Sequence, residues 1–136
     1  MAKYGSDDVV VEYDDVGGSL VDMSQYVDTM NGIKFNAEMQ EGHAFGDSWV
    51  EELFTGMKRG EDIVLEGFYD DTATSGPDVV FGMAALGSTR TLEITYGSTK
   101  TTTVETVNKS YERSSQRGQL SRFKVTLSPT GAPSEA

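Results

Sequence analysis

The sequence predicts a mainly β protein, a β-sandwich or barrel-like domain with one short α-helix. Several segments alternate apolar and polar residues with the period of two that is typical of a strand with one buried face. Clusters of glycine, aspartate and serine separate these segments at spacings that favour antiparallel sheets. With 136 residues, 37% of them hydrophobic and 24% charged, the chain suits one globular domain over residues 1–136.

The N-terminal half is expected to contain three strands. Residues 9–13 and 20–27 are rich in valine, tyrosine and leucine, and the turn-forming residues 14–19 separate them. Residues 33–40 alternate between apolar and polar side chains, which favours a half-buried strand. Residues 1–8 are expected to form a flexible N-terminal arm.

The short helix is expected over residues 47–56, where the apolar spacing changes. Asp47 or Ser48 can cap its N-terminus, and Gly56 can end it. A helix this short cannot hold alone and must pack on a sheet, so its apolar side chains are expected in the core. These side chains fall at i, i+1, i+4, i+5 and i+8, one stripe of a helix: Trp49, Val50, Leu53, Phe54 and Met57. We expect Trp49, Leu53 and Phe54 to make the core contacts.

The C-terminal half is expected to add strands at 63–68, 91–96, 101–107 and 122–127. The third of these is rich in threonine and is expected to pair with the strand before or after it. Residues 70–78 and 108–119 are polar and contain turn-forming residues, so both are expected to be loops. Residues 128–136 are expected to form an extended C-terminal tail.

The charge of the chain is unevenly distributed. The formal net charge is -11, and the first 71 residues carry 17 acidic and 4 basic side chains, whereas the rest carry 5 acidic and 7 basic ones. Proteins that bind nucleic acid through phosphate contacts need a basic surface, so the composition argues against a nucleic-acid-binding protein of this kind. It fits a surface that repels nucleic acid, or an acidic face on one copy that meets a basic face on another.

The sequence contains no catalytic motif. Cysteine is absent, which excludes disulfides and thiolate zinc sites, and His43 is the only histidine. We find neither a nucleophile elbow nor a phosphate-binding glycine loop, so we expect no enzyme activity and no cofactor. The loop acids Asp70, Asp71 and Asp78 suit calcium in type, but their spacing matches no EF-hand, and a solvated or interfacial acidic surface is the preferred interpretation.

Several segments together resemble the major tail tube proteins of long, non-contractile-tailed (siphovirus-type) bacteriophages or of a related gene transfer agent. The resemblance is clearest over residues 44–86 and extends more weakly to the C-terminus. Many relatives are longer and carry an added immunoglobulin-like domain, which is not expected in this chain, so no adhesion role is expected. The matching segments are Ala44-Phe45-Gly46-Asp47, the turn from Phe54 to Gly60, Leu65-Glu66-Gly67-Phe68-Tyr69-Asp70-Asp71, and Phe123-x-Val125-x-Leu127-Ser128-Pro129-Thr130-Gly131-Ala132-Pro133.

The resemblance implies a tube subunit, a β-sandwich that forms hexameric rings. The rings would stack around a tape measure protein into a hollow tail, with tail initiator and terminator proteins as further partners. DNA would pass through the lumen without specific binding, because an acidic lining repels phosphates. The implied location is the virion tail, assembled in the host cytoplasm. No segment approaches the roughly 18 apolar residues of a membrane span, so no membrane partner is expected.

Candidate site residues follow from this reading. Glu38, Glu66 and Glu93 lie on the polar faces of predicted strands and are candidates for the lumen. Candidates for contacts between rings come from the two loops and the strand that follows: Asp70, Asp71, Asp78, Arg113, Arg117 and Arg122. Two alternatives remain open, namely another ring-forming phage component, such as a tail terminator or connector, and a calcium- or carbohydrate-binding β-sandwich module.

Overall fold

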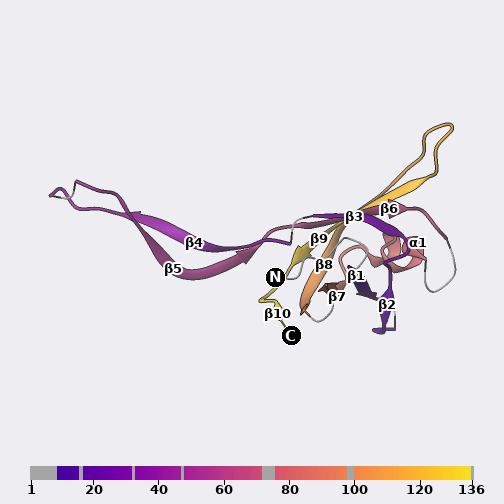
Figure 1. Ribbon diagram of the computed structural model, residues 1–136, viewed down its shortest axis with the longest axis horizontal. Helices are drawn as coiled ribbons and strands as arrows, with labels where there is room; N and C mark the ends of the chain where they lie inside the picture. The colour runs from indigo at the N-terminus through magenta and orange to yellow at the C-terminus, as the bar shows by residue number, and fades with distance from the viewer. Residues whose placement is uncertain are drawn as a thin grey trace.

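The computed structural model describes residues 9–15, 17–31, 33–46, 48–71, 76–97 and 100–135. Within these residues the protein is mainly β, with ten strands and one short helical segment, which confirms the expected fold class. One strand pair projects far from the rest of the molecule, which we call the body (Figure 1).

The body contains one antiparallel sheet of eight strands in the order β2-β1-β7-β8-β9-β6-β3, with β10 beside β8. The strands predicted at 63–68, 91–96 and 122–127 are confirmed as β6, β7 and β9. The bounds are β1 (Val10–Asp14), β2 (Leu20–Asp22), β3 (Val27–Asn31), β6 (Ile63–Phe68), β7 (Thr89–Tyr96), β8 (Lys100–Ser114), β9 (Arg122–Pro129) and β10 (Ser134–Glu135).

The long strand β8 joins the two halves of this sheet. Its first part, as far as Val107, pairs with β7, and its second part, from Thr106, pairs with β9 across a bulge between Asn108 and Ser110. The pairing of the threonine-rich segment with a neighbouring strand is therefore confirmed. The loop predicted at 108–119 is wrong for residues 108–114, because these continue β8.

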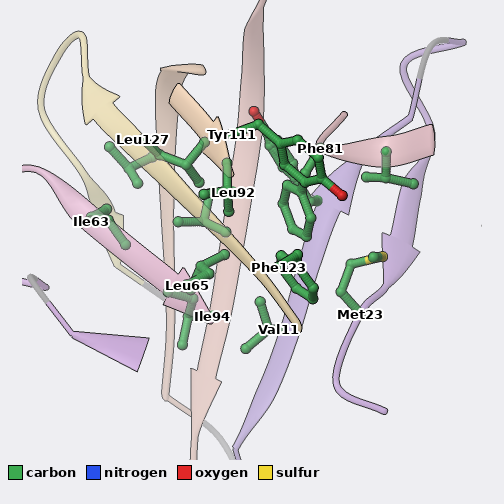
Figure 2. Packing of buried hydrophobic residues seen from close by; sticks show 14 residues of the cluster. Val11, Met23, Ile63, Leu65, Phe81, Leu92, Ile94, Tyr111, Phe123 and Leu127 are labelled. Atoms are coloured by element: carbon green, nitrogen blue, oxygen red, sulfur yellow. The ribbon is translucent and has the colours of Figure 1, made fainter. Parts of the chain in front are cut away.

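The inner faces of the two halves supply one buried cluster (Figure 2). Every second residue of β1, β6, β7 and β9 points into it, as the alternation in the sequence requires. Met23, from the turn after β2, is also fully buried. The largest fully buried apolar side chains are Tyr13, Met23, Ile63, Leu65, Phe81, Leu92, Ile94, Phe123 and Leu127.

The short helical segment consists of α1 (Pro77–Val80) and the 3-10 turn η2 (Met83–Ala85). Proline suits the first helical turn, where its missing N–H has no partner to lose. The ring of Phe81 lies 4.8 Å from that of Tyr13 and 5.7 Å from that of Phe123, so this segment is anchored in the core. The Asn108 side-chain amide donates to the carbonyl of Phe81 (2.7 Å) and holds the segment against β8.

The helix predicted at 47–56 is wrong. Residues Phe35–Gly42 form β4 and Glu51–Gly60 form β5, and these two strands make a separate sheet that projects from the body (Figure 1). Trp49, Leu53 and Phe54 are therefore not core residues, since 82%, 56% and 51% of their respective surfaces are exposed. Asp47, the proposed cap, lies outside the described residues.

The apolar spacing predicted the wrong structure because neither face of β5 is covered within the subunit. A strand with one buried face shows a period of two, whereas an uncovered ribbon is free to carry apolar residues on both faces. Gly56, with a φ of +93°, lies within an irregular stretch of β5 and is unfavourable inside a helix.

The expected C-terminal tail is also partly strand. β9 runs to Pro129, and β10 returns to pair with the first part of β8. The Thr102 hydroxyl donates to Glu135 (2.7 Å), and Lys100 lies 3.2 Å from the same carboxylate. Both contacts lower the pKa of Glu135, the hydroxyl contributing most. The predicted N-terminal arm, residues 1–8, lies outside the described residues.

Candidate assembly surfaces

The first candidate surface is the projecting strand pair, which we call the β-arm (β4, β5 and the connection between them). Met39 lies opposite Phe54, Gln40 opposite Leu53, and Glu41 opposite Glu52. Nearer the body, the register shifts between Ala37 and Met39. The side chain of Thr55 donates to the carbonyl of Glu38 (3.1 Å) at this irregularity. Bulges of this kind fix register, so the outer half of the β-arm is a defined ribbon.

The β-arm exposes an unusual number of large apolar side chains. An isolated two-stranded ribbon is at best marginally stable in water, because it has no face to bury. Contiguous exposed apolar residues are typical of a surface that another protein covers. The exposed set is Met39, Phe45, Trp49, Val50, Leu53, Phe54 and Met57.

In the outer half of the β-arm, residues 39–54, all the charged side chains are acidic. Glu41 and Glu52 lie directly opposite one another, and like charges in that position destabilise a ribbon. Glu41, Glu51 and Glu52 make no ion pair with any described residue. Nearer the body the β-arm does contain an ion pair, because Arg59 lies 2.9 Å from Glu38 across the strands. The unpaired charge is therefore concentrated away from the body.

The second candidate surface is the basic hairpin, formed by residues 109–124 of β8, β9 and their connection. It points away from the body at the end of the molecule opposite the β-arm (Figure 1). It contains five basic side chains and one acidic one, Glu112. Leu120, in the connection, is 73% exposed. This end of the molecule thus combines positive charge with an exposed apolar side chain.

The basic side chains of this hairpin are partly neutralised within the subunit. Arg122 makes two hydrogen bonds to Asp28 (3.0 and 2.8 Å), which lower the pKa of that carboxyl, and its guanidinium lies 5.1 Å from the centre of the Phe68 ring. Lys109 lies 2.9 Å from an Asp62 oxygen. Arg117 makes no ion pair with a described residue. The full basic set is Lys109, Arg113, Arg117, Arg122 and Lys124.

Asp78 and Arg113, two candidates for contacts between rings, meet within the subunit. The Tyr111 hydroxyl donates to Asp78 Oδ1 (3.0 Å), and Arg113 lies 3.7 Å from the same oxygen. Burial, followed by the hydrogen bond to Asp78, raises the pKa of Tyr111. The backbone N–H of Asp78 donates to the carbonyl of Asp70 (3.2 Å), and Asp71 is exposed beside it. Asp78 therefore lies in α1 with Asp70 beside it, whereas Arg117 lies in the connection of the basic hairpin.

The third candidate surface is the carboxylate–threonine face, the outward face of β2, β1, β7 and the first part of β8. Asp22, Glu12, Glu93 and Thr103 form one row across these strands, in register. Burial raises the pKa of Glu12, and the neighbouring charges of Glu93 and Asp22 raise it further. The other outward side chains of β7 and β8 are mostly threonine, and no lysine or arginine occupies a described outward position.

The structure does not bring the three lumen candidates together. Glu93 lies in the carboxylate–threonine face. Glu66 lies on the outward face of the other half of the sheet, opposite Lys124 on β9, and Glu38 pairs with Arg59 in the β-arm. Sequence reasoning missed Glu12, although its position between the buried Val11 and Tyr13 was a usable signal.

The described residues contain no group of three or more histidine, cysteine or acidic side chains arranged to hold a metal ion. In the same part of the chain, no helix has the length and apolar character needed to cross a membrane. What distinguishes the described surface is instead the separation of the acidic β-arm, the basic hairpin and the carboxylate–threonine face.

Comparisons with known proteins agree with this fold. No protein-family model matches the sequence, and no curated protein matches it. Among solved structures, a chain in the tail of an empty gene transfer agent particle, refined with helical C6 symmetry, matches with a TM-score of 0.79 at 15% identity, over 98% of this chain and 99% of that chain.

Two further solved structures come from the anti-feeding prophage. A chain in its six-fold symmetrised baseplate matches with a TM-score of 0.76 at 12% identity, over 100% of this chain and 97% of that one. A chain in its tube-terminating cap matches with a TM-score of 0.71 at 10% identity, over 100% and 92%. At these identities the likeness shows the fold, and the expected tail tube-like fold is confirmed.

Proposed function

We propose that this chain is a structural subunit of a phage-type tail tube, which forms hexameric rings that stack into a hollow tube. The observation that carries this proposal is the match, over nearly the whole of both chains, to a chain in a gene transfer agent tail with C6 symmetry. The proposed role is structural and not enzymatic. The tube would belong to the virion tail and assemble in the host cytoplasm.

The exposed surfaces support assembly. The β-arm has no covered face, and it exposes tryptophan and phenylalanine side chains that a monomer gains nothing by exposing. The main sheet ends in β2 and β3, whose outer edges pair with no other described strand. Unpaired edges are natural sites for joining sheets of neighbouring subunits, so the rings would close by edge-to-edge contact.

The carboxylate–threonine face is the proposed lining of the channel. Glu93, with Glu12 and Asp22 beside it, would repel the phosphates of passing DNA, and the threonine hydroxyls offer no cation to hold them. DNA would therefore move through without specific binding. Before DNA enters, the same lumen would hold a tape measure protein, and initiator and terminator proteins would bound the tube.

The lining assignment has its own test. Assembled tubes of the double variant Glu12→Lys with Glu93→Lys should retain DNA in a salt-sensitive manner, whereas tubes of the unaltered protein should not. Equal DNA retention by both tubes, at low salt, would show that this face lies elsewhere.

Electron microscopy of the concentrated protein tests the proposed function. We expect striated hollow tubes whose end views show sixfold rings, formed alone or after addition of tape measure and initiator proteins. Isolated rings would favour the terminator role, which the match to a tube-terminating cap supports as the second candidate. Protein that stays monomeric under all these conditions would contradict both roles.

A further inference from the structure

We infer that β10 is a displaceable cover on the edge of β8, which holds back assembly until it moves aside. In the free subunit β10 occupies the backbone edge with which another copy in the same ring would pair. The inference rests on the proposed function and adds to it a step that regulates assembly. It is carried by the pairing of β8, by the contacts of β10 and by the order of strands in the sheet.

The first part of β8 has one edge that no long strand covers. One side of residues 100–107 pairs with β7, but on the other side β9 begins to pair only at Thr106. Residues 100–105 therefore present a row of backbone N–H and C=O groups on that side. Among the described strands only β10, two residues long, pairs with them. An edge of this kind readily pairs with a strand of another chain when it is uncovered.

β10 is held to this edge by few contacts. Ser134 lies opposite Thr103, and Glu135 lies opposite Thr102. The Glu135 carboxylate accepts a hydrogen bond from the Thr102 hydroxyl (2.7 Å) and lies 3.2 Å from Lys100. Both residues of β10 are exposed, and neither belongs to the buried cluster. Exposed ion pairs contribute little stability, and segments with few buried apolar contacts open most readily, so β10 can leave β8 without disturbing the core.

The chain before β10 has a second attachment that can stay in place when β10 moves. The backbone N–H and the side-chain hydroxyl of Thr130 both donate to the carbonyl of Glu105 (2.9 and 3.2 Å). Residues 131–133 connect this attachment to β10 and form no strand, and Gly131 and Ala132 are exposed. The connection can therefore act as a hinge, about which β10 moves away from β8 while Thr130 stays bound.

The strand that would replace β10 is β2 of a second copy. β2, β1, β7 and the first part of β8 form the half of the sheet that carries the carboxylate–threonine face. The outer edge of β2 is one margin of this half and pairs with no described strand, whereas the edge of β8 is the other margin. A ring in which this half is continuous must join the β2 margin of one copy to the β8 margin of the next.

The direction of β10 matches that of the strand that it would give way to. Each successive pair from β2 through β1 and β7 to β8 is antiparallel, so β2 runs antiparallel to β8. In a continuous barrel of identical copies, β2 of the neighbouring copy would keep that direction. β10 is also antiparallel to β8. It therefore satisfies the same backbone groups that the incoming strand would use, and the two strands cannot occupy the edge together.

A reversible disulfide tests the inference, and the chain has no cysteine that could compete. The variant Thr103→Cys with Ser134→Cys places thiols at opposite positions of β8 and β10. Opposite Cα atoms of antiparallel strands lie about 4.5 to 5.5 Å apart, within the range of a disulfide. We expect the oxidised variant to form several-fold less ring and tube than the unaltered protein at the same concentration. Reductant should restore its assembly.

The matched control carries a disulfide that leaves β10 free. Thr95 and Thr101 face one another across β7 and β8, with their hydroxyl oxygens 3.1 Å apart. The variant Thr95→Cys with Thr101→Cys should assemble equally well with and without reductant. The single variants Thr103→Cys and Ser134→Cys should assemble like the unaltered protein, because neither can close the lock within one subunit.

Weakening the cover gives the opposite readout. Glu135→Ala removes the acceptor for Thr102 and the ionic partner of Lys100. It should lower the concentration needed for assembly several-fold and leave the melting temperature of the monomer unchanged, since β10 is not part of the buried cluster. Weaker assembly of Glu135→Ala would show instead that β10 helps to build the ring, which contradicts the inference.

The outcomes separate this inference from the proposed function. Tubes formed equally by the oxidised and the reduced Thr103→Cys, Ser134→Cys variant would show that β10 stays on β8 in the ring. That result would overturn the inference and leave the tube role standing. Assembly by Glu135→Ala alone, with the unaltered protein remaining monomeric, would support both. If neither protein assembles under any of the conditions above, the cover and the tube role are both contradicted.

Discussion

Replacing Trp49 by alanine separates a core role from an interface role. Trp49 lies on the β-arm with 82% of its surface exposed, so its removal should change the free energy of unfolding of the subunit by less than about 0.5 kcal/mol. Phe81 supplies the matched control, because it is fully buried between Tyr13 and Phe123. Phe81→Ala should cost about 3 to 5 kcal/mol.

The assay is urea denaturation followed by circular dichroism, at a concentration at which the protein is monomeric. Tryptophan fluorescence cannot serve for this comparison, because Trp49 is the only tryptophan. In the unaltered protein the same fluorescence becomes useful, since burial of Trp49 on assembly should shift its emission to shorter wavelength.

Trp49→Ala should instead impair assembly of the subunits. An aromatic anchor at the centre of an interface contributes about 2 kcal/mol or more, which corresponds to roughly a 30-fold rise in the concentration needed for tubes. Sedimentation of Trp49→Ala across a concentration series measures this shift. The reasoning is refuted if Trp49→Ala destabilises the monomer by 3 kcal/mol or more, because the β-arm would then pack on the body.

Three further predictions concern the body. Gly67→Ala should lower the melting temperature, with a cost of about 1 to 3 kcal/mol, because the added Cβ would lie 1.8 Å from the Tyr26 carbonyl oxygen; an unchanged melting temperature would contradict the close packing of β6 on that turn. Asp28 has its pKa lowered from 3.8, mainly by Arg122, so its unfolded form binds the proton more readily. Its contribution to stability is present above pH 3.8 and is lost as pH falls through the folded-state pKa, and urea midpoints across this window should show a smaller loss in Asp28→Asn. Glu12 has its pKa raised from 4.5, so its ionisation opposes folding above that pH; Glu12→Gln should raise the melting temperature at pH 7 and leave it unchanged at pH 3.

The strands that could be predicted from the sequence are those with one buried face. β6, β7 and β9 each bury alternate residues, and the period of two follows from that burial. The second part of β8 was missed because only Tyr111 is buried after Asn108, so the segment has the composition of a loop. The β-arm was mistaken for a helix because no residue of β4 or β5 is buried within the subunit, so β5 shows no period of two.

The candidate surfaces were predictable to a smaller extent. Alternation placed Glu93 on an outward face, but its position beside Glu12 depends on the pairing of β1 with β7, in which paired residues lie 79 to 85 positions apart in the sequence. Register at such distance is set by packing of the whole sheet and not by any local pattern. The opposite positions of the acidic and basic surfaces likewise emerge only from the three-dimensional arrangement.

The pairing of β3 with β6 at the base of the β-arm has a consequence for how the length of the β-arm can vary. Met30 pairs with Leu65 and Asn31 with Val64. The β-arm is therefore inserted between two paired strands of the body, as a long loop would be. The entropic cost of closing a loop rises only with the logarithm of its length. Adding two residues to each strand of the β-arm would extend its reach by about 7 Å while leaving the core untouched. Reach and core stability therefore reside in separate residues, and evolution or design can change one while conserving the other.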